Sequence, residues 1–262
     1  MSAIIIDDKI VHYEVLGRGK PIIFLHGWVG SWRYWIPAMQ SASTAYRAYA
    51  FDLWGFGETA KDPRHYTLQE QTDLLDQFMN AMGIGKIALI GHGLGALVAL
   101  QYAAQHTYVV DRIMVISIPA KGEAYVERIS RLSTTELANR LLEQNPAVDA
   151  ARKDVDKADL KAVSTSLEEM GALDLDALYQ QMNTASLLVH GLKDPLLQNM
   201  DGSSNGGLPN MFHQVVFDES GHFPMLDQPN KFHRLMKDFL DLPSGESPRQ
   251  LQLKEEWKRR VR

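Results

Sequence analysis

The feature that most constrains the fold is a run of 24 residues, 87–110, with no aspartate, glutamate, lysine or arginine. A run of this length is long enough to cross a bilayer as a helix. Three glycines fall within five of its residues, however, and two glutamines and a histidine follow them. This composition favours a buried strand at 87–90, a tight turn and a buried helix at 94–106. We therefore expect no membrane span.

Strand and helix patterns alternate over most of the remaining chain, after short strands expected at 4–6, 9–15 and 21–25. Such alternation is typical of βαβ units and of a mainly parallel sheet. A length of 262 residues fits one large α/β domain with an insertion. The further expected strands are 46–52, 113–118, 186–190 and 211–217, and the further expected helices are 67–82 and 230–240.

The alternation stops at residues 119–184, which are polar and helix-like, with eight acidic and eight basic residues between positions 121 and 161. We expect this insertion to form a helical cap, or lid. The alternative is a solvated helical excursion. Residues 1–118 and 185–242 then form the core, and residues 243–262 form a C-terminal tail.

Composition excludes several classes of protein. The chain has no cysteine, which excludes thiol nucleophiles, disulfides and cysteine-ligated zinc. Its 27 basic and 32 acidic residues are interspersed and give a net charge of −5, which argues against a nucleic-acid partner. The N-terminal residues lack the apolar core of a signal peptide, so a cytoplasmic protein, monomer or homodimer, is expected. In the tail, Leu253, Trp257 and Val261 share a helical face, typical of a surface anchor or of a frayed terminal helix.

Four short motifs fall at the ends of expected strands, where open α/β sheets bind their ligands. Each motif is weak alone, but their order and context support one another. They are His26-Gly27-Trp28, Gly91-His92-Gly93-Leu94-Gly95, His190-Gly191-Leu192-Lys193-Asp194 and Gly221-His222-Phe223.

Together with a D-x-x-G-x-G turn at 52–57, these motifs resemble the α/β-hydrolase family from about residue 10 to residue 240. That family carries a nucleophile on a G-x-S-x-G elbow, then an acid after a later strand, then a histidine. The resemblance implies that Gly93, Asp194 and His222 occupy these positions. It also implies an α/β-hydrolase fold, a mostly parallel sheet flanked by helices, and a small carboxylic ester or related acyl substrate with no cofactor.

Gly93 departs from the family pattern, because no hydroxyl, thiol or carboxylate lies anywhere in the turn. A serine nucleophile needs an imidazole to take its proton and a carboxylate to orient that imidazole, and His222 with Asp194 would supply this pair. The backbone N–H groups of Trp28 and Leu94 would form the oxyanion hole. We expect His92 to be a packing residue. Substrate contacts are expected from His26, Gly27, Trp54 and Phe223.

Three interpretations of Gly93 stay open. The chain is a hydrolase whose serine, or whose aspartate in another lineage, has been replaced in the laboratory or by drift. Alternatively, His222 oriented by Asp194 is a general base in an enzyme that needs no nucleophile. In the third, the chain is a pseudoenzyme that binds a small apolar ligand.

Two other classes fit the sequence less well. Residues 91–96 satisfy the dinucleotide-binding pattern G-x-G-x-x-A, but the acid expected about 20 positions on is lacking, since Asp111 precedes the next strand. The histidines show neither H-x-x-x-H nor H-E-x-x-H spacing, so no metal is expected.

Overall fold

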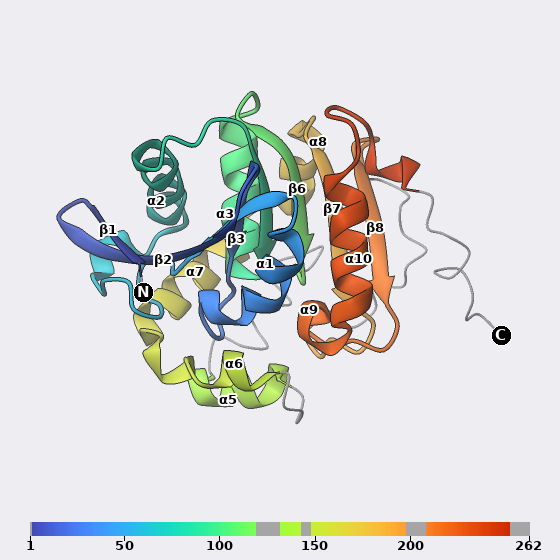
Figure 1. Cartoon of the computed structure of the whole chain (residues 1–262). Coiled ribbons are helices and arrows are strands. Elements are labelled where there is room, and N and C mark those ends of the chain that lie inside the picture. The colour runs from blue at the N-terminus through green and yellow to red at the C-terminus, as the bar shows by residue number, and fades with distance from the viewer. Residues whose placement is uncertain (1, 119–131, 143–147, 198–207, 252–262) are drawn as a thin grey trace.

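The computed structural model describes residues 2–118, 132–142, 148–197 and 208–251. It forms a three-layer arrangement in which helices cover both faces of one sheet (Figure 1). Within the described residues no helix is long and apolar enough to span a membrane. The expectation for the helical face of the tail lies outside the described residues.

Eight strands form the sheet, in the order β1-β2-β4-β3-β5-β6-β7-β8. β1 pairs antiparallel with β2, and β2 with β4, whereas every later pair is parallel. The mostly parallel sheet expected from the alternating pattern is therefore confirmed. The strands are β1 (Ser2–Ile6), β2 (Lys9–Gly17), β3 (Lys20–Leu25), β4 (Tyr46–Phe51), β5 (Ile87–His92), β6 (Val110–Ile116), β7 (Ala185–Gly191) and β8 (Phe212–Phe217).

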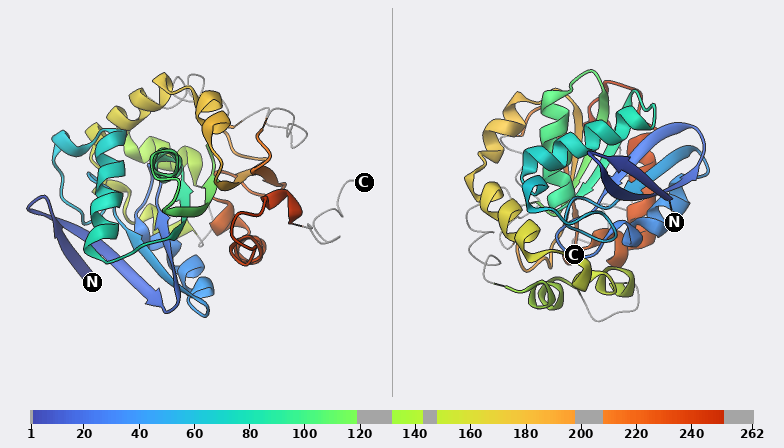
Figure 2. Two further views of the ribbon diagram at one scale, coloured as in Figure 1. Left: turned by 90° about the horizontal axis from the view of Figure 1, so that it is seen from above. Right: turned by 90° about the vertical axis from the view of Figure 1, so that its left-hand side faces the viewer.

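Two groups of helices cover the sheet. Figures 1 and 2 show α2, α3 and α8 on one face and α1 and α10 on the other. The α-helices are α1 (Ile36–Ala42), α2 (Leu68–Ala81), α3 (Leu94–Gln105), α5 (Thr134–Leu141), α6 (Asp149–Arg152), α7 (Leu160–Ala172), α8 (Leu175–Gln181), α9 (Pro224–Asp227) and α10 (Pro229–Leu240), and the short 3-10 helices are η1 (Trp32–Trp35), η2 (Pro63–His65), η4 (Val155–Lys157) and η5 (Pro248–Gln250).

The uncharged run forms the centre of the molecule. β5 has parallel neighbours on both sides, and α3 is buried along most of its length. A strand and a helix that are covered all round need apolar side chains on every face, which is why charged residues are absent here.

β6 begins at Val110, three residues before the expected start at residue 113. Asp111 and Arg112 conceal this start in the sequence, because charged residues are unusual in a buried strand. The Arg112 guanidinium satisfies its donors on the carbonyl oxygens of Phe239 (2.5 Å) and Leu242 (2.7 Å) and on the Asp111 carboxylate (2.7 Å). A charged strand residue is tolerated because its partners come from the end of α10.

The helices of the insertion lie between β6 and β7 in the chain. Figure 1 shows α5 and α6 beyond the sheet edge at which β6 and β8 end. α8 differs, since it packs beside α3 in the helical layer. The carboxyl-terminal edge of the sheet is therefore the edge nearest to α5 and α6.

Candidate active site

The turn between β5 and α3 is tight and built on glycines. Gly93 has φ 51° and ψ −115°, immediately before α3 begins at Leu94. A Cβ at Gly91 would collide with the carbonyl oxygen of Gly95, and a Cβ at Gly95 with that of Leu25. These two glycines are required by close backbone contacts, whereas Gly93 is favoured by its positive φ.

Asp194 and His222 come together from two different strand ends. Asp194 follows β7 and His222 follows β8. The imidazole Nδ1 lies 2.7 Å from Asp194 Oδ2, and each residue is only 1% exposed. The other carboxylate oxygen, Oδ1, accepts the backbone N–H of Leu196 at 2.9 Å. Two hydrogen bonds thus fix the carboxylate, and the carboxylate orients the ring.

The second ring nitrogen of His222, Nε2, makes no hydrogen bond to any described residue. With Nδ1–H donating to Asp194, Nε2 carries the lone pair. A neutral imidazole held in this tautomer can accept a proton at Nε2, which is the arrangement of a general base.

His92 connects the turn to the loop that carries His222. Its Nε2 lies 3.0 Å from the backbone oxygen of His222, which can only accept, so Nε2 carries the proton. Nδ1 then accepts from the Tyr34 hydroxyl at 3.0 Å, and that hydroxyl accepts the Gly27 N–H at 2.7 Å. The Ser117 hydroxyl also donates to the His222 oxygen, at 2.8 Å. The expected packing residue is thus part of a hydrogen-bonded chain.

His26 is completely buried, and its ring forms hydrogen bonds with two backbone groups. Its Nε2 accepts the N–H of Leu53 at 3.0 Å, so Nδ1 carries the proton and donates to the Gly27 oxygen at 2.8 Å. The His26 backbone oxygen accepts the Gly95 N–H at 2.9 Å. His26 therefore joins the loop after β3, the loop after β4 and the start of α3. Its expected contact with substrate stays a prediction.

Three groups of loops, after β3, β5 and β7–β8, thus meet at the carboxyl-terminal edge of the sheet. This geometry can be compared with that of known proteins. The sequence profile described as "Alpha/beta hydrolase family" matches residues 22–235. The chain belongs to the alpha/beta hydrolase family.

Curated and solved proteins resemble the chain over most of its length. A 2-hydroxy-6-oxo-6-(2'-aminophenyl)hexa-2,4-dienoic acid hydrolase from Metapseudomonas resinovorans is 24% identical, covering 87% of this chain and 86% of its own. A thermophilic esterase from Thermogutta terrifontis superposes with a TM-score of 0.76 at 22% identity, covering 88% of this chain and 93% of its own. A serine-to-glycine variant of an N-acyl homoserine lactonase, complexed with N-hexanoyl homoserine lactone, superposes with a TM-score of 0.78 at 18% identity, covering 92% of this chain and 99% of its own. The α/β-hydrolase fold expected from the motifs is confirmed.

The two residues expected to supply oxyanion donors, Trp28 and Leu94, both lie next to Gly93. The N–H of Leu94 is the first amide of α3 and makes no hydrogen bond to any residue in the described part of the chain. The positive end of a helix dipole favours negative charge at that amide. Trp28 stands opposite, since two of its ring carbons would lie 3.0 Å from a Cβ at Gly93. Their role as oxyanion donors stays a prediction.

Phe223 and Trp54 occupy different surroundings, and both are 1% exposed. The Phe223 ring packs on His92, with centroids 4.6 Å apart, and on His222, at 5.4 Å. Trp54 lies further along the loop after β4, where its backbone forms two hydrogen bonds with Gln71, both 2.9 Å. Phe223 therefore borders the His222–Asp194 pair directly.

The insertion is bonded to the loop that carries Trp28. The indole Nε1–H of Trp28 donates to Ser166 Oγ of α7 at 2.9 Å. The Ser31 hydroxyl donates to Asp154 at 2.5 Å, and Arg33 Nε donates to the same carboxylate at 3.1 Å. These contacts hold the helices of the insertion against the loop after β3.

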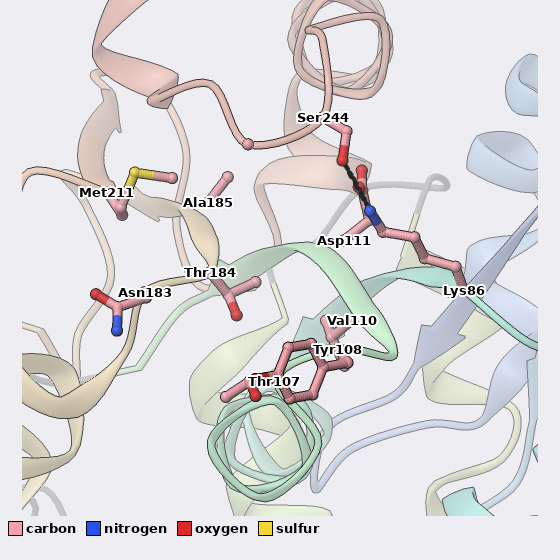
Figure 3. Close-up of a pocket in the computed structure, with 11 residues that line it drawn as sticks. Lys86, Thr107, Tyr108, Val110, Asp111, Asn183, Thr184, Ala185, Met211 and Ser244 are labelled. Carbon is pink, nitrogen blue, oxygen red and sulfur yellow. Dashed lines mark hydrogen bonds and ion pairs between the residues drawn. The ribbon is translucent and has the colours of Figure 1, made fainter.

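A separate pocket of about 230 Å³ opens at the opposite edge of the sheet (Figure 3). Val110 and Ala185, the first residues of β6 and β7, line it. The Lys86 amino group points at Asp111 and Ser244 in this pocket and lies 2.8 Å from an oxygen of each. The pocket therefore lies apart from the His222–Asp194 pair, which follows the carboxyl ends of the strands.

Sequence reasoning missed three side chains of the site. Tyr34, Ser117 and Ser166 act through contacts with residues far away in the chain. None belongs to a motif, and hydroxyl residues are common in loops and helices. No local signal in the sequence marks them. Among the described residues, no group of three or more histidine or carboxylate side chains is placed to hold a metal ion.

Proposed function

We propose that this chain belongs to the lineage of small carboxylic-ester and acyl hydrolases, with the His222–Asp194 pair retained and Gly93 at the position of the nucleophile. The observation that carries the proposal is the 2.7 Å contact between His222 Nδ1 and Asp194 Oδ2. The pair is buried, and His92 bonds its backbone directly to the turn that contains Gly93. A buried, oriented imidazole beside a strand–turn–helix elbow is the arrangement that acyl hydrolases use.

Each proposed role follows from chemistry at a named atom. His222 Nε2 accepts the proton of the attacking group, and Asp194 stabilises the imidazolium that forms. The amides of Trp28 and Leu94 would donate to the oxygen of the substrate carbonyl as it becomes negative. In a protease, loss of the nucleophile lowers turnover by about 10⁶ and leaves roughly 10³ to 10⁴ over water. The chain as it stands is therefore expected to be a slow catalyst.

The names of the relatives support an acyl substrate. They are a hydrolase of a hexadienoic acid, an esterase and an N-acyl homoserine lactonase. The lactonase is of particular interest because a serine-to-glycine variant holds its acyl lactone. We propose a small carboxylic ester or related acyl substrate for this chain. We also propose that the insertion at 119–184 forms the cap over it, except for α8, which packs beside α3.

A second candidate is an enzyme in which His222 acts directly on water or on an acidic substrate proton. His222 Nε2 has no hydrogen-bond partner among the described residues, which favours this candidate, because a base needs only that lone pair and the Asp194 contact. In this candidate Gly93 contributes no reacting atom. A His222→Ala variant would abolish turnover, and Gly93→Ser would leave it unchanged.

Covalent labelling tests the first proposal. A fluorophosphonate probe should add its mass to a Gly93→Ser variant at residue 93, because an activated serine attacks phosphorus. The parent protein and a Gly93→Ser/His222→Ala double variant should stay unlabelled. A folded Gly93→Ser protein that reacts no faster than the double variant would reject a nucleophile position at residue 93.

A further inference from the structure

The space above Gly93 is filled by an aromatic ring. A Cβ at this residue would lie 3.0 Å from both Cε3 and Cζ3 of Trp28, closer than the usual 3.5 to 4.0 Å between packed carbons. The contact differs in kind from those at Gly91 and Gly95, where backbone oxygen atoms exclude a side chain. At Gly93 the obstacle is a side chain, which a substitution can remove.

The ring is held where it stands. Trp28 is 2% exposed, and its indole N–H donates to Ser166 Oγ at 2.9 Å. Ser166 is itself buried, and its hydroxyl donates to backbone oxygen atoms of its own helix, Ala162 O at 2.8 Å and Val163 O at 3.0 Å. Displacing the ring away from residue 93 therefore strains a hydrogen bond to α7. A Cβ at 3.0 Å requires the ring to shift by a few tenths of an ångström, and the hydrogen bond to Ser166 opposes that shift.

From this placement we infer that Trp28 and Gly93 are a matched pair, in which the indole takes the space where the nucleophile side chain would stand. Trp28 is then the residue that determines which side chains the elbow accepts and how closely an acyl carbon approaches it. This inference rests on the proposed function for its effect on turnover. Its steric part can be measured without any substrate.

The test is a set of four proteins: the parent, Gly93→Ser, Trp28→Leu and the double variant. Hydrolysis of p-nitrophenyl acetate is measured for each, with circular dichroism to verify folding. We expect the gain from Gly93→Ser to be at least about tenfold larger when Trp28 is leucine than when the ring is present. Gly93→Ser/Ser166→Ala, which keeps the ring but removes its tether, should give an intermediate gain.

A matched control uses another buried tryptophan. Trp35 packs against Phe24, Tyr34 and Phe232, and none of its atoms is among the three nearest to a Cβ at Gly93. Trp35→Leu should leave the gain from Gly93→Ser unchanged. Equal gains with and without the Trp28 ring would overturn the inference while the proposed function stands.

A double-variant cycle of melting temperatures tests the inference without any measurement of turnover. Gly93→Ala costs stability in any background because φ is positive there, but only the Trp28 background adds the collision with the ring. The fall in Tm on Gly93→Ala should be at least about 3 °C smaller in the Trp28→Leu protein. If no variant hydrolyses the ester but this coupling is present, the proposed function fails and the matched pair stands. Equal falls in Tm would overturn the matched pair.

Discussion

His92 is a neutral histidine at the centre of the site. Burial, with the nearby His222 as the second cause, lowers its pKa well below the usual range. Burial likewise lowers the pKa of His26. Both rings also use one nitrogen as an acceptor, from Tyr34 in one case and from Leu53 in the other. Protonation would break these contacts, so both rings stay uncharged in the folded protein.

Acid should therefore destabilise the fold through His92. Its pKa is lower in the folded state, so below about pH 6.5 the unfolded chain binds a proton that the folded chain does not. Stability is present at neutral pH and falls as the pH drops below that value. His92→Gln keeps a donor for the His222 oxygen and removes the proton. The unfolding free energy, measured with urea between pH 7.5 and 5, should depend less steeply on pH in this variant than in the parent, by up to about 1.4 kcal/mol per pH unit. An unchanged slope would contradict a neutral His92.

Asp194 should matter for catalysis far more than its single charge suggests. In the Gly93→Ser background, Asp194→Asn should lower kcat by about 10⁴, because the amide no longer holds the imidazole in the reactive tautomer. Asp218→Asn is the matched control, since that carboxylate is exposed and bonds to Lys231. Steady-state hydrolysis of p-nitrophenyl acetate measures both. Similar losses in the two variants would remove Asp194 from the mechanism.

Among the elements, the carboxyl end of α10 depends on a residue of β6. Arg112 bonds two carbonyl oxygens there and the neighbouring Asp111. Burial raises the Asp111 pKa, but hydrogen bonds from Lys86, Ser244 and Arg112 outweigh it and bring the pKa to about 2. The Asp111 carboxylate is therefore ionised at neutral pH and pairs with both Lys86 and Arg112.

Arg112→Met should cost about 3 kcal/mol of unfolding free energy, because it removes the guanidinium donor from two carbonyl oxygens and one of the three donors of Asp111. Arg64→Met is the control: Arg64 bonds only the neighbouring loop carboxylate of Asp62 and is 80% exposed at its side chain. That change should stay within about 0.5 kcal/mol. Chemical denaturation compares the two directly. A loss at Arg112 no larger than at Arg64 would show that the α10 contact contributes little.

Most elements of the core were predictable because local pattern determines them, but α1 was not among the expected helices. Continuous apolar runs predict β3 and β5, and Thr67, whose hydroxyl accepts the Glu70 N–H, marks the start of α2. The start of β6 was missed, because Asp111 and Arg112 are charged and their partners lie more than a hundred residues away. Pattern reasoning fails where a distant backbone satisfies a local charge.

The same limit applies to the site. The positions of Asp194 and His222 could be predicted, because each lies in a short motif after a strand. Other contacts of the site join segments far apart in sequence. They are the hydrogen bonds of His92 and Ser117 to the His222 backbone oxygen and that of the Trp28 indole to Ser166. These contacts depend on the packing of whole layers and leave no pattern in the chain.

At the scale of the whole molecule, the insertion and the core meet at a buried carboxylate. Asp154 is bonded to Ser31 and Arg33 of the core and to Lys157 of its own segment, at 3.0 Å. Burial alone would raise the pKa of Asp154, but these hydrogen bonds lower it by a larger amount. The net shift of the pKa is therefore downward. The carboxylate thus keeps the charge that holds both cations.

Asp154→Asn should loosen the insertion from the core. Backbone amides of residues 28–33 and 149–157 should exchange with deuterium at least about tenfold faster, because local opening becomes easier by about 1.4 kcal/mol or more. Asp156→Asn, two residues along, is the control and should leave exchange unchanged. Exchange that is equally slow in both variants would exclude Asp154 as the link.

The central claim is that residue 93 stands where a nucleophile acts with His222. The most direct measurement is hydrolysis of p-nitrophenyl acetate by the parent, by Gly93→Ser and by Gly93→Ser/His222→Ala, all verified as folded. We predict that Gly93→Ser raises kcat/KM by orders of magnitude and that this gain is larger when Trp28 is replaced by leucine. The gain should be lost when His222 is replaced by alanine. No gain in a folded Gly93→Ser protein, with or without Trp28→Leu, would contradict it.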